Sequence, residues 1–231
     1  MDMLWNWLIQ LGDRFYTAFF AADRWKLYLS GLGNTLSITL GAICISTVLG
    51  MLLCLMKISR HKVLRAPAKA YIDIIRGIPV VVQLMIIYFV VLASWTNKTA
   101  VGIIAFAINS AAYTAEIFRS GINSVDSGQM EAGRSLGLSN TQTMWHIIFP
   151  QAIKNCLPTY TSEFIVLVKE TAVVGYIGMT DLTKAYSTVQ SRTMDPLPPL
   201  LIIAVVYFII TKILSIVFSY MERRLRESDR R

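Results

Sequence analysis

Long uncharged stretches dominate the hydrophobic pattern of this sequence, and their lengths match helices that cross a membrane. A helix rises about 1.5 Å per residue, so roughly 20 apolar residues cross the hydrocarbon of a bilayer, which is about 30 Å thick. The longest such stretch holds no charged side chain between Lys26 and Lys57. The pattern predicts an all-α integral membrane protein with five transmembrane helices, at about residues 27–56, 78–97, 99–118, 152–172 and 198–220.

The composition agrees with a membrane protein and excludes an ordinary soluble domain. Of the 231 residues, 55% are hydrophobic and only 16% are charged. The net charge of +8 is interpreted first as a topology signal, because Lys and Arg accumulate on the cytoplasmic side of membrane proteins, and no nucleic-acid partner is expected. Cys44, Cys54 and Cys156 all lie in apolar stretches and are interpreted as small core residues rather than as a disulfide framework or a zinc site.

Basic residues gather at two places on the same side of the predicted bundle. One group follows the first span, and the other forms a basic tail at residues 221–231. With five spans, both groups and the loop of residues 120–151 face the cytoplasm, so the N-terminus is expected outside and the C-terminus inside.

The first 26 residues are predicted to form an external amphipathic segment rather than a signal peptide. Leu4, Leu8, Leu11, Phe15 and Phe19 recur at three- and four-residue steps, as on one face of a helix. Such a helix either lies on the outer membrane surface or packs on the bundle, and the sequence leaves both open.

Polar residues inside the spans mark a candidate substrate pathway, because exposing them to lipid is costly. Glu163 is the strongest candidate, since its carboxylate can bind an ammonium or guanidinium group. A packing hydrogen bond to a neighbouring helix is an equal alternative. Gln83, Asn109 and Tyr113 are weaker pathway candidates. Near the ends of spans, the sequence also suggests an ion pair of Glu116 with Arg119. Arg76 is expected to contact either lipid phosphates or Asp73.

The loop of residues 120–151 is predicted to carry two short helices. Gly137 suits the left-handed position after the first helix, with Leu138 as the hydrophobic residue that follows it. Ser139 and Gln142 have capping-box spacing and open the second helix, which stops near Pro150. The two helices would form a compact unit that exposes the small residues Ala132 and Gly133 and either docks in a groove of another protein or packs on its own bundle.

This loop resembles a known family. Glu131-Ala132-Gly133, then Gly137, Ile147 and Phe149-Pro150, are similar to the EAA loop of permease subunits in bacterial binding-protein-dependent ABC importers. Gly133 and Phe149 replace the usual Ala and Leu. Further matching residues, over roughly residues 29–220, indicate the polar amino-acid branch, at Arg76-Gly77-Ile78-Pro79, Gln83-Leu84, Tyr113-Thr114-Ala115-Glu116-Ile117, Ser162-Glu163-Phe164-Ile165 and Lys169-Glu170-Thr171.

The resemblance implies a type I importer permease fold in the bacterial cytoplasmic (inner) membrane. It implies two ATP-binding ABC subunits that dock on the loop through Glu131, Ala132, Gly133, Gly137 and Leu138, an external solute-binding protein, and a second permease copy or paralogue. The substrate would be a polar amino acid, and membrane lipids would surround the spans. The chain itself is expected to bind no cofactor and no metal and to catalyse no reaction, with ATP used by the partner subunit.

Apart from the resemblance, the sequence itself also indicates that any ATP is used by another subunit. It contains no G-x-x-x-x-G-K-[ST] phosphate-binding loop. A self-contained, ion-coupled secondary transporter or channel with Glu163 as its proton-responsive group is the alternative, and a membrane-embedded enzyme is a more distant one. The secondary transporter is disfavoured because one chain has few spans and no recognisable inverted repeat.

Overall fold

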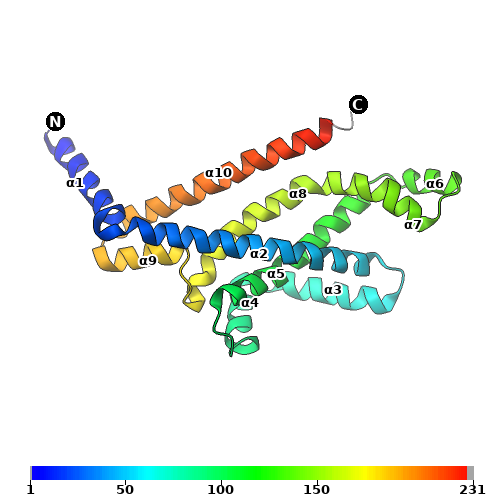
Figure 1. The fold of residues 1–231 in the computed structure, drawn as a ribbon, viewed down its shortest axis with the longest axis horizontal. Coiled ribbons are helices and arrows are strands. Elements are labelled where there is room, and N and C mark those ends of the chain that lie inside the picture. Colours follow the sequence, from blue (N-terminus) through cyan, green and yellow to red (C-terminus); the bar gives the residue numbers. More distant parts are fainter. Residues whose placement is uncertain (1, 228–231) are drawn as a thin grey trace.

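The computed structural model describes residues 2–227, and within them the chain is an elongated assembly of helices joined by short turns (Figure 1). Its longer helices are α1 (Asp2–Phe19), α2 (Trp25–Ile58), α3 (Lys62–Gly77), α5 (Lys98–Asn123), α8 (Phe149–Glu170), α9 (Leu182–Thr193) and α10 (Leu197–Glu227). The shorter ones are α4 (Val80–Ile86), α6 (Gly128–Ser135) and α7 (Asn140–Thr143), the π-helices η2 (Ile87–Val91) and η3 (Met144–Ile148), and the 3₁₀ helices η1 (Ala21–Asp23) and η4 (Thr171–Ile177).

Three of the described helical segments are long and apolar enough to cross a membrane: Ala21–Ile58, Lys98–Asn123 and Leu197–Leu225. A fourth is present if α3 and the following Val80–Val91 segment count as one span bent by 108°. Helix α8 has 22 residues, a sufficient length, but carries Lys154, Glu163, Lys169 and Glu170. The all-α membrane fold is therefore confirmed, and the predicted boundaries of the five spans stay predictions.

Helix α3 differs from the sequence expectation, which treated its residues as a basic connecting segment. Ala68 and Ile72 of α3 are buried, and the Tyr71 hydroxyl donates a 2.7 Å hydrogen bond to the Ile108 carbonyl of α5. Its basic residues lie on the other, exposed side of this amphipathic helix. Counting uncharged intervals does not detect such a helix, because its charged residues interrupt the apolar pattern.

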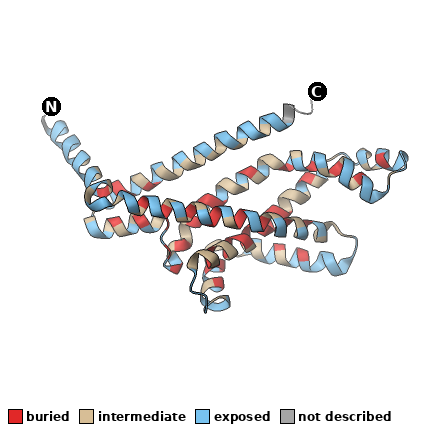
Figure 2. Cartoon of the chain, in the orientation of Figure 1, coloured by how far each residue is buried: buried red, intermediate tan, exposed pale blue. Residues whose placement is uncertain are grey.

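The core lies mainly between α2 and α5. Ile38 and Ala42 of α2 and Phe106 of α5 have no exposed surface, and they join one cluster with Leu84 of α4 and Leu167 of α8. Figure 2 shows the burial concentrated along α2 and α5, whereas α10 is mostly exposed. Only 6% of the apolar window of α10 is buried, so lipid or another subunit covers it in the membrane.

The two ends of the molecule carry different elements. Figure 1 shows α1 and α9 at one end and α6 and α7 at the other. The N-terminal helix predicted from the three- and four-residue steps is present as α1.

Cys54 and Cys156 are buried as expected, but Cys44 is exposed, so its interpretation as a core residue is wrong for this chain. Arg230 and Arg231 of the predicted basic tail lie outside the described residues.

Candidate functional site

Glu163 lies in the middle of α8 and faces α5. Its carboxylate accepts a 3.0 Å hydrogen bond from the hydroxyl of Ser110, which is fully buried. Three residues earlier on α8, the Tyr160 hydroxyl is hydrogen-bonded to the Thr47 hydroxyl of α2. Glu163 itself is only partly buried. The carboxylate is therefore oriented by one donor while part of the side chain remains accessible to a ligand.

Gln83 and Asn109 are brought together, and their contacts are structural. The Gln83 amide donates to the carbonyl oxygens of Ile75 at 2.6 Å and Ile78 at 2.7 Å, where the chain bends between α3 and α4. The Asn109 amide donates in turn to the Gln83 side-chain oxygen at 3.2 Å. This chain of hydrogen bonds satisfies backbone carbonyls that the broken helix leaves free, as a membrane protein requires.

Tyr113 of α5 contacts a basic residue of α3. The Arg76 guanidinium carbon lies 5.4 Å from the centre of the Tyr113 ring, which is cation–π geometry. Among the described residues, Arg76 therefore contacts Tyr113 of α5 instead of forming the suggested ion pair with Asp73. The predicted Glu116–Arg119 ion pair is present at 2.9 Å. Lys57 of α2 also contacts Glu116, a partner 59 residues away that sequence spacing does not indicate.

The unit formed by residues 128–148, which we call the knob, has the predicted turn at its centre. Gly137 has a φ of +85°, in the left-handed region that glycine enters without steric cost. The Leu138 amide donates to the Gly133 carbonyl at 3.1 Å, and the Gly137 amide donates to the Arg134 carbonyl at 3.0 Å. These two bonds form a Schellman motif, which confirms the predicted end of the first helix.

The second helix of the knob starts as predicted, but it does not stop near Pro150, because α7 continues through η3 into α8 and Pro150 lies in the first turn of α8. The Ser139 hydroxyl accepts from the Gln142 amide at 3.3 Å, and the Gln142 side chain accepts from the Ser139 amide at 2.8 Å, completing a capping box. Gly133, in contrast, is buried between the two helices rather than exposed. A β-carbon on Gly133 would lie 2.5 Å from the Thr143 Cγ2 atom, so glycine permits this close packing. The expectation that Gly133 presents a surface is therefore wrong.

The exposed surface of the knob includes large apolar side chains that the sequence analysis did not single out. Leu136 is 80% exposed and Trp145 is 54% exposed. Ala132 and Glu131 are also exposed, and Leu138 is partly buried. A hollow of about 490 Å³ lies beside this surface, lined by Arg60, Met130, Asn140, Thr141, Met144 and Trp145. Exposed leucine and tryptophan beside a hollow are typical of a surface that another protein covers.

The chain matches a protein family over most of its length. The family described as "Binding-protein-dependent transport system inner membrane component" matches residues 31–227. The matched region contains the knob, the bend between α3 and α4, and Glu163. Helix α1 lies before it.

Individual relatives and solved structures agree with this match. The chain is 38% identical over 200 residues to GlnP of Rickettsia typhi, named for a glutamine transport system, covering 85% of the chain and 92% of the relative. It is 37% identical over 204 residues to "Arginine transport system permease protein ArtQ" of Bacillus subtilis, covering 87% and 93%.

Among solved structures, one titled "Crystal structure of an amino acid ABC transporter with histidines" has a TM-score of 0.81 and 44% identity, covering 86% of this chain and 94% of that one. An inward-facing MetNI methionine ABC transporter has a TM-score of 0.77 at 19% identity, covering 89% and 99%, and shows the shared fold.

Proposed function

Because the chain belongs to the binding-protein-dependent transport system inner membrane component family, we propose that its knob docks a separate ATP-binding subunit. The chain is a membrane-spanning permease subunit of an ABC importer for polar amino acids. ATP hydrolysis would occur in the partner, so the permease has to convert a motion outside the membrane into a change of its pathway. The knob is the element suited to receive that motion.

The geometry of the knob supports docking. Its two helices are held at a fixed angle by the Schellman motif, the capping box and the contact of Gly133 with Thr143. A small rigid unit of this kind transmits force without deforming. Its apolar Leu136 is presented to the outside instead of the bundle, as expected for an anchor residue of a protein interface. This exposed leucine is the single observation that carries the docking proposal.

The assembly would contain two copies of the permease, two ATPase subunits and an external solute-binding protein. One chain encloses little polar space, and the mostly exposed α10 leaves ample surface for a second copy. The knob end would face the cytoplasm, consistent with the basic residues of α3 and of the described end of α10, Arg223 and Arg224. The α1–α9 end would face outward.

Glu163 is the residue proposed to contact the amino acid in transit. A carboxylate held by a single serine retains oxygen lone pairs for a charge-assisted hydrogen bond to an ammonium or guanidinium group. The names of the arginine and glutamine relatives support a polar substrate with nitrogen donors. Gln83 and Asn109 are proposed to keep the bent span in shape instead of lining the pathway.

Co-reconstitution of the chain with its ATPase subunit tests docking through the knob. Leu136→Asp places a charge on the exposed surface, whereas Thr143→Ala trims a fully buried side chain of the knob and serves as the matched control for local stability. Gly137→Asp tests the turn itself. The proposal expects Leu136→Asp and Gly137→Asp to lose copurification of the ATPase subunit and ATP-dependent uptake.

The same experiment distinguishes docking from folding. Leu136→Asp should leave the unfolding temperature of the permease unchanged, because Leu136 packs on little of its own chain. If Leu136→Asp recovers as much ATPase subunit as the wild type, the knob surface is not the docking site. Uptake by the chain alone in a proton gradient would instead support the self-contained transporter.

A further inference from the structure

Helix α1 has two halves with different environments. In its C-terminal half, Ala18 is 1% exposed and joins a cluster with Tyr28 of α2, Leu182 of α9 and Ile203 of α10, and Phe19 packs against that cluster. The N-terminal half extends beyond the bundle at the end opposite the knob (Figure 1). Helix α1 is thus attached to the permease by one end only.

The unattached half of α1 is covered with large apolar side chains. The exposed fractions are 87% for Met3, 70% for Leu4, 67% for Trp5, 56% for Trp7 and 52% for Leu8. Leu4 and Leu8 continue the helical stripe whose later members, Leu11 and Phe15, are half-buried against the protein. A patch of this kind in water would promote aggregation, so something apolar covers it.

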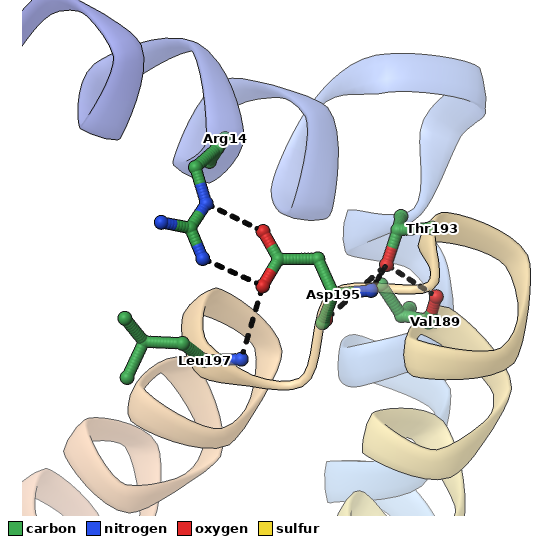
Figure 3. A network of polar contacts seen from close by, with 5 residues as sticks. All are labelled: Arg14, Val189, Thr193, Asp195 and Leu197. Carbon is green, nitrogen blue, oxygen red and sulfur yellow. Dashed lines mark hydrogen bonds and ion pairs between the residues drawn. The ribbon is translucent and has the colours of Figure 1, made fainter.

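A pair of charged residues fixes the direction in which α1 leaves the bundle. The Arg14 guanidinium donates two hydrogen bonds to the Asp195 carboxylate, from Nε at 2.6 Å and from Nη2 at 2.8 Å (Figure 3). Asp195 lies in the turn between α9 and α10, where the Leu197 amide donates to the same carboxylate at 3.3 Å. Because a bidentate pair constrains orientation as well as distance, Arg14 holds α1 against this turn.

The connection to α2 reinforces the same geometry. Ala22 and Asp23 have φ values of +52° and +55°, a conformation that residues with a β-carbon rarely adopt. These two residues break the helix between α1 and α2, so α1 does not continue along the axis of the first membrane-spanning helix (Figure 1). Only Arg24 separates these residues from Trp25, where α2 begins. Helix α1 is therefore held beside the start of the first membrane-spanning helix.

We propose that α1 is an interfacial anchor whose N-terminal half lies in the lipid headgroup region at the end of the permease opposite the knob. In this arrangement Leu4 and Leu8 reach the upper acyl chains, and Trp5 and Trp7 lie at headgroup depth. The Arg14–Asp195 pair connects this anchor to the α9–α10 turn. The anchor thereby fixes the position of the outer end of the permease relative to the membrane surface.

The chemistry of the exposed half favours a lipid surface over a protein partner. Two tryptophans among aliphatic residues are typical of the membrane–water interface, where an indole ring meets both apolar chains and polar headgroups. By sequence, α1 carries Asp2, Asp13 and Arg14 as its charged residues, so its one basic side chain is Arg14, which is already paired with Asp195. Binding would therefore depend on apolar contact and be insensitive to the fraction of anionic lipid, unlike attachment by a basic segment.

Tryptophan quenching in vesicles tests the anchor with the full chain. In a background of Trp25→Phe, Trp95→Phe and Trp145→Phe, the remaining signal comes from Trp5 and Trp7. The protein is reconstituted in vesicles of phosphatidylethanolamine and phosphatidylglycerol that contain lipids brominated either near the headgroup or near the chain end. Bromine near the headgroup should quench more strongly, and raising the salt concentration should leave the difference unchanged.

Arg14→Gln tests the charged pair in the same background, and the double variant Arg14→Asp with Asp195→Arg tests its restoration. Arg14→Gln should lose the preference for shallow bromine, and the double variant should regain it. Lys26→Gln is the matched control, because Lys26 pairs only locally with Asp23 on the exposed surface. Quenching by neither lipid, or stronger quenching by deep bromine, overturns the anchor. A preference that Arg14→Gln leaves intact overturns the role of the pair.

Discussion

The Ser110 hydroxyl of α5 donates to the Glu163 carboxylate of α8 at 3.0 Å, which ties the principal acidic residue of the proposed pathway to a helix of the buried core. One side of the carboxylate is therefore occupied by the protein itself. This geometry is compatible with both roles that the sequence leaves open for Glu163, because the carboxylate joins two helices and keeps lone pairs for a ligand.

Two substitutions at this contact separate those roles. Glu163→Gln keeps an oxygen that accepts from Ser110 but removes the charge, so the unfolding temperature should change little. Uptake of a cationic amino acid should fall about tenfold or more, since a hydrogen bond to a charged group is worth about 1.5–3 kcal/mol. Ser110→Ala should instead cost about 1 kcal/mol of stability with a smaller loss of uptake. Equal uptake by Glu163→Gln and the wild type would make Glu163 purely structural.

The bend between α3 and α4 should depend on the donors of Gln83. Gln83→Glu has nearly the same shape but replaces the amide that serves the Ile75 and Ile78 carbonyls with an acceptor. We expect a loss of about 1–3 kcal/mol, because buried carbonyls lose their partners. Thermal unfolding in detergent measures the loss. Tyr113→Phe keeps the ring beside Arg76 and should leave the stability close to that of the wild type; similar losses in both variants would contradict this role of Gln83.

The buried position of Gly133 predicts a coupled effect with Thr143. Gly133→Ala should destabilise the knob by about 1–3 kcal/mol, because the new methyl group overlaps Thr143. In a Thr143→Ala background the same substitution should cost less, since the overlapping atoms are gone. The four proteins form a double-mutant cycle measured by thermal unfolding and by recovery of the ATPase subunit. Additive effects would mean that the two residues are not in contact.

The Arg14–Asp195 pair predicts a pH range for the interfacial anchor. The hydrogen bonds from Arg14 hold the pKa of the Asp195 carboxyl below its ordinary value of 3.8. A group with a lowered pKa in the folded state contributes its stability above the ordinary pKa and loses it as the pH falls through the lowered one. The shallow preference in tryptophan quenching should thus stay constant from about pH 8 to about pH 5 and disappear only below about pH 4. Loss near neutral pH would contradict the pair as the fixing contact.

The features that could be predicted from the sequence were local ones. The turn at Gly137 and the capping box of Ser139 and Gln142 depend on neighbouring residues, so their spacing sufficed. The ion pair of Glu116 with Arg119 was likewise visible, but its third member, Lys57, comes from a different helix. Contacts between residues far apart in the sequence are set by tertiary packing, and spacing carries no information about them.

The predictions that the structure contradicts also concern features set by tertiary packing. The apolar pattern does not indicate α3 because its charges interrupt that pattern, although its buried stripe through Ala68 and Ile72 follows helical periodicity. The run of small residues predicts Gly133 on a docking surface, whereas the structure places it against Thr143. The exposure of Leu136 could not be read from the sequence, because an apolar residue at a helix end is equally compatible with a buried contact.

Uptake by proteoliposomes tests the central claim that this permease moves polar amino acids through coupling at the knob. The wild type and Leu136→Asp are each reconstituted with the ATPase subunit and the binding protein, and uptake of labelled arginine and glutamine is measured with and without ATP inside. The account predicts uptake by the wild type only with ATP and the ATPase subunit, and its loss in Leu136→Asp with an unchanged unfolding temperature. Uptake without the ATPase subunit, or full activity of Leu136→Asp, would contradict it.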